Sequence, residues 1–218
     1  MKNIFAHRGL VSGSFSENSL SAFREAVFMK KGIELDVRIT NDGVPVVFHD
    51  KTLKRMCGDK RKVSDCTYDE ICTLHLLDTE EKIPTLDEVL SLVAGKVPLL
   101  IEIKLPKRFL WHHKLEKAML PLLKKYKGEY LLQSFNKYSM RYMKRKLPKV
   151  KCGILSGNNY SEPDGFDFIS YRLKGLTPKK MSSLKEKYNE IFLWTGKQLS
   201  EAELKKVIAE YRPDGIIN

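Results

Sequence analysis

The sequence contains few cysteines and lacks a long apolar run. Its 218 residues include 4 cysteines without a CxxC pair, so we expect reduced thiols rather than disulfides or a zinc site. A membrane helix needs roughly 18 continuous apolar residues, which are absent here, and the amino terminus shows no signal-peptide pattern. These absences predict a soluble, cytoplasmic protein. With 42% hydrophobic residues, the chain can form a single domain over residues 1–218.

Acidic residues are scarce in one basic segment of the chain. Residues 104–151 contain 15 Lys or Arg against two acids, Glu116 and Glu129, which accounts for the net charge of +12. Such a face can attract nucleic acid, an anionic membrane or a phosphorylated substrate, and it is also typical of a solvated helix surface. Four apolar residues in this segment have helical spacing: Leu115, Met119, Leu122 and Tyr126. This spacing predicts a helix core rather than stacking platforms, so we expect no nucleic-acid partner.

Apolar runs and helical patterns alternate along most of the chain. Strands are predicted near residues 3–7, 33–39, 98–104, 130–134, 151–155, 167–170, 191–194 and 214–217. Helices are predicted near residues 19–30, 85–94, 111–127, 137–147, 178–188 and 200–211. The connection from Ser156 to Phe166 favours little helix. This alternation predicts an α/β fold, a (β/α)8 TIM barrel, with an open doubly wound sheet as the alternative.

One segment, from about residue 40 to residue 84, interrupts the alternation. Asn41-Asp42-Gly43 is typical of a tight turn that returns the chain into the apolar run 44–48, and the rest is largely polar. We interpret it as a small insertion after the second strand, covering the carboxyl-terminal mouth of the barrel.

The sequence stops at Asn218, just after the last predicted strand, with no closing helix. The groove between the last and first strands would then be exposed, filled by the insertion, or covered by another subunit. We therefore expect modest self-association into a homo-oligomer.

Two predicted strands carry charges where a buried strand normally has apolar side chains. The second contains Glu34 and Asp36, and the third contains Glu102 and Lys104. Residues two apart in a strand share a face, so each pair points the same way. An edge strand with one wet face would explain them. Buried carboxylates would instead require a bound cation or a paired charge network, because an uncompensated buried charge is very costly.

Two further polar segments stand where apolar patterns end. His7-Arg8-Gly9 follows the first strand pattern, and His49-Asp50 follows the apolar run after the tight turn. Proteins of the α/β class build their sites at strand ends, so these histidines favour a site over a pair of edge strands.

An ordered set of motifs resembles the glycerophosphodiester phosphodiesterase family. In chain order they are His7-Arg8-Gly9, Glu17-Asn18, Glu34-Leu35-Asp36-Val37, Asp42-Gly43, Val47-Phe48-His49-Asp50, Pro84-Thr85-Leu86-Asp87-Glu88-Val89-Leu90 and Glu102-Ile103-Lys104. The resemblance is dense over residues 4–104. Beyond it, compatible segments are Gln133-Ser134-Phe135, Trp194-Thr195 and Asp214-Gly215-Ile216. No single tripeptide is specific, whereas the ordered set is.

This resemblance implies a metal-dependent barrel enzyme that cleaves glycerophosphodiesters into sn-glycerol 3-phosphate and an alcohol. Carried over residue by residue, it implies one divalent cation on Glu34, Asp36 and Glu102, with His7 and His49 as acid and base. Three oxygen ligands without a cysteine suit Mg²⁺ or Ca²⁺. Imidazole titrates near neutral pH and can serve in either role.

Four further residues are candidates for binding the substrate. Arg8 offers a planar fork for phosphate oxygens and Lys104 a compact positive charge, with structural salt bridges as the alternative for each. Glu17 either stands at a helix start that Asn18 or Ser19 caps, or supports Arg8 or His7. Trp194 either lines the substrate pocket or packs in the core.

Other features weaken or limit the resemblance. His112-His113 opens the basic helix and matches no family position, so we predict no metal role there. Thr195 is followed by Gly196-Lys197 instead of the Val-Asn common in the family, which can alter recognition of the glycerol or the alcohol.

Two alternative functions remain at this stage. One is a phospholipase D-like reaction on lysophospholipids through a cyclic phosphate, and the other is a catalytically silent phosphate- or headgroup-binding module. The first is disfavoured because the sequence shows no apolar surface helix for entering a bilayer. The second is disfavoured because every expected acid, base and ligand is present.

Overall fold

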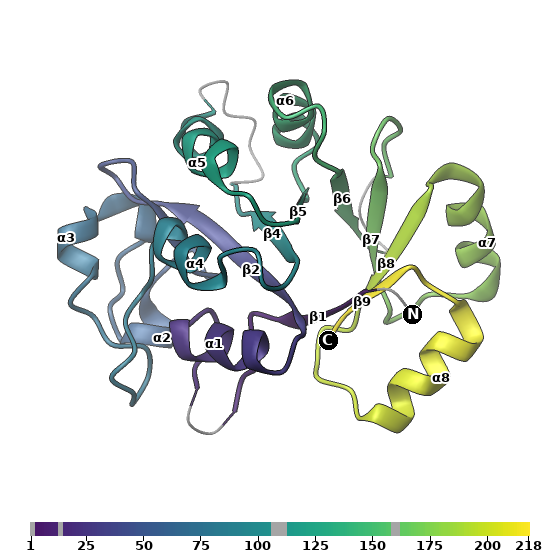
Figure 1. Ribbon diagram of the computed structural model, residues 1–218, viewed down its shortest axis with the longest axis horizontal. Helices are drawn as coiled ribbons and strands as arrows, with labels where there is room; N and C mark the ends of the chain where they lie inside the picture. Colours follow the sequence, from purple (N-terminus) through teal and green to yellow (C-terminus); the bar gives the residue numbers. More distant parts are fainter. Residues whose placement is uncertain (1–2, 13–14, 106–112, 158–161) are drawn as a thin grey trace.

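Parallel strands close into a barrel surrounded by helices in the computed structural model, which describes residues 3–12, 15–105, 113–157 and 162–218 (Figure 1). The parallel strands in sheet order are β1 (Asn3–His7), β2 (Gly32–Ile39), β4 (Leu99–Ile103), β5 (Tyr130–Ser134), β6 (Cys152–Ser156), β7 (Phe168–Arg172), β8 (Glu190–Trp194) and β9 (Gly215–Ile217). Strand β1 pairs with both β2 and β9, so the sheet closes. The (β/α)8 prediction is confirmed and the open-sheet alternative is wrong.

The longer helices lie between successive parallel strands. They are α1 (Leu20–Phe28), α4 (Leu86–Val93), α5 (Lys114–Lys125), α6 (Lys137–Lys146), α7 (Pro178–Lys187) and α8 (Glu201–Tyr211). Local sequence explains where several begin: Thr85 and Ser200 each form a capping box with the glutamate three residues later. The predicted ranges agree with these bounds within a few residues. The predicted start at residue 111 and part of the 156–166 connection lie outside the described residues.

Apolar side chains from six of the parallel strands form a cluster in the barrel interior. The members of this interior cluster are Phe5, Leu100, Leu131, Phe168, Phe192 and Ile217. Gly153 makes room for the cluster, because a Cβ at that position would lie 2.2 Å from the Phe168 ring. The opposite strand faces, including Leu35 and Ile101, pack beneath the helices in the main core. Side chains further along the inward faces therefore lie at the carboxyl-terminal mouth.

The segment between β2 and α4 has a small apolar core of its own. It contains β3 (Pro45–Val47), α2 (Lys54–Cys57), a 3₁₀ turn η1 (Val63–Asp65) and α3 (Tyr68–Ile71). Its buried cluster consists of Val46, Phe48, Leu53, Met56, Val63, Cys66, Ile71, Leu76 and Ile83. The predicted tight turn is present, with Gly43 at φ +95°. Strand β3 runs antiparallel to β2, and the pairing of Val47 with Val37 brings the chain to His49 beside the mouth.

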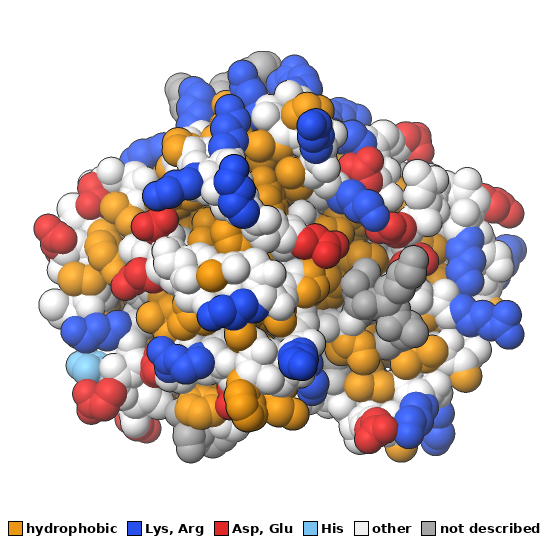
Figure 2. All heavy atoms as spheres, viewed as in Figure 1, with side chains coloured by type: hydrophobic (Ala, Val, Ile, Leu, Met, Phe, Trp, Pro, Cys, Tyr) orange, Lys and Arg blue, Asp and Glu red, His pale blue; other side chains and the backbone are white. Residues whose placement is uncertain are grey.

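The basic segment forms a charged outer surface. Lys and Arg side chains gather at the top of the view in Figure 2, where Figure 1 places α5 and α6. Leu115 and Met119 are buried and Leu122 and Tyr126 pack against them, as predicted. All four cysteines are free, also as predicted. In the part of the chain that the structure describes, no helix has the length and apolarity needed to cross a bilayer.

Candidate active site

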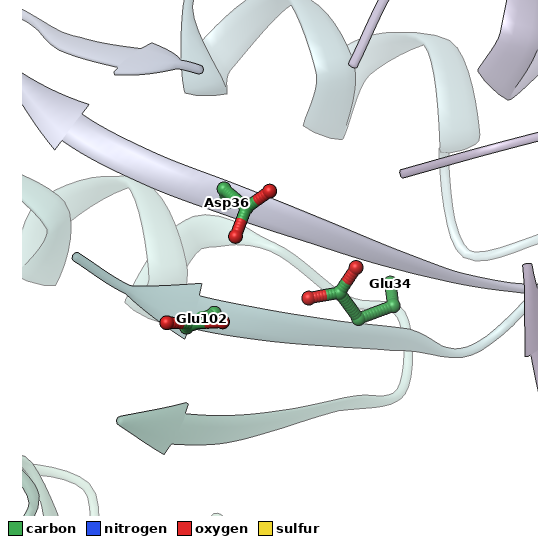
Figure 3. Close-up of side chains that lie close together, drawn as sticks. All are labelled: Glu34, Asp36 and Glu102. Carbon is green, nitrogen blue, oxygen red and sulfur yellow. The ribbon is translucent and has the colours of Figure 1, made fainter. Parts of the chain in front are cut away.

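Three carboxylates converge at the mouth of the barrel from two neighbouring strands. Glu34 and Asp36 lie on β2 and Glu102 on β4, and the register pairs Asp36 with Glu102 (Figure 3). One oxygen of each lies within 4.8 Å of the others. The residues are 1%, 1% and 7% exposed, so the interpretation of β2 and β4 as wet edge strands is wrong.

Two basic side chains offset part of this buried charge. Lys104 Nζ lies 2.8 Å from Glu102 and 3.3 Å from Asp36. Arg8 Nε lies 3.3 Å from Asp36 without forming a hydrogen bond, and the Arg8 backbone N–H donates to Glu34 at 3.2 Å. Glu34 therefore has the weakest compensation, since its nearest basic side chain is His7 at 3.9 Å.

The electrostatics of the three carboxylates fit a divalent cation. Burial and the charge of Asp36 raise the pKa of Glu34 well above its usual range. Burial also raises the pKa of Glu102 to about 7. Although burial opposes it, Lys104 holds the pKa of Asp36 below its usual range, with His49 and Arg8 adding to this effect. A cation with oxygen ligands at about 2.0 to 2.6 Å would satisfy carboxylates spaced in this way, and these donors suit Mg²⁺ or Ca²⁺.

The two histidines lie close to this carboxylate group. His7 ends β1 next to Glu34 in register, and His49 follows β3. Their side chains are 32% and 31% exposed, so a bound molecule can reach them. Burial lowers the pKa of His7 to about 4, with Arg8 adding to the shift. Burial also lowers the pKa of His49, but Asp50, 2.7 Å from His49 Nδ1, acts in the opposite direction.

A sharp turn after β1 positions the Arg8 backbone. Arg8 adopts φ +61°, in the left-handed region that non-glycine residues seldom occupy. Gly9 follows at φ +87°, and a Cβ there would lie 2.9 Å from Ala22 Cβ in α1. This turn directs the Arg8 N–H toward Glu34.

The Arg8 side chain extends toward Glu17, with a distance of 2.9 Å from Nη1 to the carboxylate. Of the two readings weighed for Arg8, the structure shows the ion pairs. Binding of a phosphate by Arg8 stays a prediction.

Glu17 and Asp50 are joined by an arginine from the insertion. Arg55 donates to both Asp50 oxygens, at 2.7 and 3.0 Å, and to both Glu17 oxygens, at 2.6 and 3.1 Å. Glu17 supports Arg8, and Asp50 supports His49. Arg55 therefore links the carboxylate that contacts Arg8 to the carboxylate that contacts His49. The sequence does not indicate this role, because the partners Glu17 and Asp50 are 38 and 5 residues away from Arg55.

Two other positioning residues were missed. Asn18 Nδ2 donates to Asp36 at 3.0 Å, while Ser19 supplies the helix cap. Arg38 donates through Nε and Nη2 to the His49 backbone carbonyl at 2.8 and 2.6 Å. The alternation along β2 could have indicated Arg38, because it shares a face with Glu34 and Asp36.

Replacing Arg55 by alanine is expected to lower kcat about tenfold, because both Asp50 and Glu17 lose charge-assisted hydrogen bonds that orient their partners. Initial rates under saturating substrate would measure this effect. Arg61→Ala is the matched control, since Arg61 joins Asp59 and Glu70 in the same insertion away from the histidines. A folded Arg55→Ala variant with unchanged kcat would show that the bridge is only structural.

Trp194 ends β8, across the barrel from the carboxylates, and its packing supports the core interpretation, while a role in lining the substrate pocket stays a prediction. It is half-buried and packs against the interior cluster, while its ring meets Phe135 edge-on at 6.5 Å. Its Nε1 donates to the Ser156 carbonyl at 3.1 Å. The guanidinium of Arg172 lies 5.2 Å from the ring centroid.

His113 belongs to a separate contact. Its Nδ1 lies 3.0 Å from buried Glu116, and its ring stacks on Tyr142. The trio Glu34, Asp36 and Glu102 is the cluster with metal-binding spacing in the described parts of the chain. His112 lies outside the described residues.

Comparisons with known proteins agree with the motif resemblance. The model of the glycerophosphoryl diester phosphodiesterase family matches residues 7–208. A glycerophosphodiester phosphodiesterase from Caldanaerobacter subterraneus subsp. tengcongensis is 32% identical over 207 residues, covering 88% of this chain and 84% of that protein. A second, from Bacillus altitudinis, is 32% identical over 173 residues, covering 75% and 70%.

Solved structures show the same architecture. A glycerophosphodiester phosphodiesterase from Thermotoga maritima superposes with a TM-score of 0.76 at 29% identity, covering 100% of this chain and 94% of that one. An Oleispira antarctica phosphodiesterase in complex with sn-glycerol-3-phosphate has a TM-score of 0.85 at 21% identity, covering 100% and 92%. At that identity the second likeness concerns the fold alone. The chain belongs to the glycerophosphoryl diester phosphodiesterase family and is an enzyme of the phosphodiester hydrolase class.

Proposed function

We propose that this enzyme hydrolyses glycerophosphodiesters to sn-glycerol 3-phosphate and an alcohol, with one divalent cation and with His7 and His49 as base and acid. The observation that carries the proposal is the convergence of three buried carboxylates and two accessible histidines at one end of the barrel. The names of the relatives and family membership support the substrate class.

Glu34, Asp36 and Glu102 would hold the cation, Mg²⁺ or Ca²⁺. When bound, the cation supplies a Lewis acid that stabilises negative charge growing on the phosphoryl oxygens. Arg8 and Lys104 line the same face with positive charge. Lys104 favours the ionised form of Asp36 and partly offsets the effect of burial on Glu102, and Arg8 presents its fork beside them.

The two histidine environments support different roles. His7 has the more strongly lowered pKa, so it is neutral at neutral pH and can accept the proton of the attacking oxygen. His49 is held through Nδ1 by Asp50, which favours the protonated ring and leaves Nε2 to donate a proton to the leaving alkoxide. The oxygen of a water molecule bonds to phosphorus as the phosphorus–oxygen bond to the alcohol breaks, which releases sn-glycerol 3-phosphate and the protonated alcohol.

Release of glycerol 3-phosphate from a panel of glycerophosphodiesters tests this function. The panel contains choline, ethanolamine, inositol and glycerol esters, each assayed with Mg²⁺, with Ca²⁺ and with a chelator. Divalent-dependent release supports the proposal. Release of a cyclic phosphate as the final product, or turnover of lysophospholipids alone, would replace it with the phospholipase D-like reaction. Binding without turnover would indicate the silent binding module.

Affinity for the divalent cation should increase with pH between about 5 and 8. Glu34 has a raised pKa and Glu102 a pKa of about 7, so both hold protons at low pH that a cation must displace. Calorimetry in buffers of different ionisation enthalpy would count the protons released at pH 6. Binding that releases no protons at this pH would contradict the prediction.

The same carboxyls should make the metal-free protein less stable as pH rises from about 4.5 to 7. Over this range the unfolded state gives up protons that folded Glu34 and Glu102 retain, so the folded state binds more protons and its stability falls with pH. Thermal unfolding with a chelator across this range would measure the net slope, to which His7 contributes with the opposite sign because its pKa is lowered to about 4, and added cation should shift the slope toward positive values.

A further inference from the structure

We propose that the half of the mouth formed by Arg172 and Trp194 recognises an anionic group on the leaving alcohol. The preferred substrates would then be glycerophosphodiesters whose alcohol carries a second phosphate or a carboxylate. This inference rests on the proposed function and deepens it, since it concerns the part of the substrate that lies beyond the scissile phosphate.

Strand alternation places Arg172 at the mouth. Phe168 belongs to the interior cluster, and Ser170 donates to Gln133 Oε1 at 2.7 Å inside the barrel. Arg172 is two residues further along β7 and ends it, so it shares their inward face at the carboxyl-terminal edge. The register pairs it with Trp194 at the end of β8. Its side chain is exposed, so it can contact a ligand.

The charge of Arg172 lacks a carboxylate partner among the described residues. Other arginines near the mouth are engaged: Arg8 and Arg55 with acids, and Arg38 with the His49 carbonyl. The residues whose placement is not described (1–2, 13–14, 106–112 and 158–161) include no Asp or Glu. An exposed arginine beside an active site and without an acidic partner favours a negatively charged ligand.

The aromatic wall holds the guanidinium in place. Trp194 is anchored by its hydrogen bond to the Ser156 carbonyl and by its edge contact with Phe135. Arg172 lies over the Trp194 ring at 5.2 Å from its centroid. This contact orders the arginine and occupies the aromatic face that a quaternary ammonium would otherwise use. The positive charge of Arg172 would repel a cationic alcohol such as choline. It would attract an anionic alcohol, and the guanidinium is already in position to bind it.

The carboxylate half and the arginine half of the mouth therefore differ in what they bind. Glu34, Asp36 and Glu102 provide the negative charge that a cation needs, and Arg172 provides positive charge on the opposite strands. A diester that extends across the mouth would place its phosphate at the first half and its alcohol at the second.

Three diesters with the same glycerol phosphate half test the inference. They are glycerophosphocholine, glycerophosphoglycerol, and glycerophosphoglycerol phosphorylated on its terminal hydroxyl. The measurement is kcat/KM for each, with the native enzyme, with Arg172→Gln, and with Lys179→Gln, which removes one positive charge from the exposed surface of α7. The native enzyme should prefer the phosphorylated diester over glycerophosphoglycerol about tenfold or more, as one charge-assisted contact allows.

Arg172→Gln should reduce this preference to about twofold, mainly by raising KM for the phosphorylated diester. Lys179→Gln should keep the native preference. Equal rates on the anionic and neutral diesters, or a preference that survives in folded Arg172→Gln, would overturn the inference while leaving the hydrolase function intact. Absence of turnover on all three diesters would overturn the proposed function and the inference with it.

Discussion

Replacing His49 by alanine is expected to lower kcat about 10²- to 10⁴-fold, because the leaving alkoxide loses its proton donor. The same range is expected for His7→Ala, which removes the base. Both side chains are about one-third exposed, so the folded state should tolerate their truncation. Steady-state rates of glycerol 3-phosphate release, compared with circular dichroism of each variant, would measure the effect.

His75→Ala is the matched control for His49→Ala. His75 lies in the same insertion, exposed and bonded to the Thr79 carbonyl. Its loss should leave kcat within about twofold of the native value. Near-native turnover by a folded His7→Ala or His49→Ala variant would contradict the assignment of that histidine.

The contact between Asp50 and His49 predicts an effect on the pH–rate profile. Asp50→Asn should shift the basic limb of this profile to lower pH, because His49 then loses its proton at lower pH.

Replacing Glu34 by glutamine is expected to reduce divalent-dependent turnover about 10³-fold or more, because an amide oxygen is a much weaker ligand for a hard cation. The opposite effect is expected on the stability of the metal-free protein. Glu34 is buried with little compensation and has a raised pKa, so an isosteric neutral side chain removes a penalty at pH 8. A gain of about 1 kcal/mol would raise the Tm by about 2 to 4 °C.

Titration calorimetry with Mg²⁺ and Ca²⁺, steady-state rates and thermal unfolding in chelator would together measure these two effects. Glu129→Gln is the control, because Glu129 is an exposed acid outside the site. A Glu34→Gln variant that still binds the cation and responds to it would remove Glu34 from the ligand set. Loss of turnover together with a lower metal-free Tm would indicate that Glu34 is structural.

The predictions that succeeded depend on periodicity within short segments. Glu34 and Asp36, two apart in β2, share a face whatever the rest of the chain does, and the same holds for Glu102 and Lys104. Helix starts such as Thr85 are equally local, because the cap and its glutamate are three residues apart. The resemblance of the ordered motifs to one family added the prediction that these strand ends form a single site.

The apolar core of the insertion is not evident in the sequence, because its residues follow no regular period. Its buried side chains, such as Leu53, Val63 and Ile71, occur singly among polar residues, so no apolar run marks them. They cluster only because short turns fold this segment against β3. Apolar residues without a regular period carry little information until the path of the chain is known.

The sequence by itself determined the barrel class, the strands that carry the carboxylates and histidines, and the side-chain face on which these groups lie. Only the tertiary structure decided that Asn18 binds Asp36, that Arg55 joins Glu17 to Asp50, and that Arg172 lies over Trp194. The physical reason is range. Strand and helix periodicities are set by neighbouring residues, whereas these contacts depend on the register in which distant strands pair and on the closure of the sheet between β1 and β9.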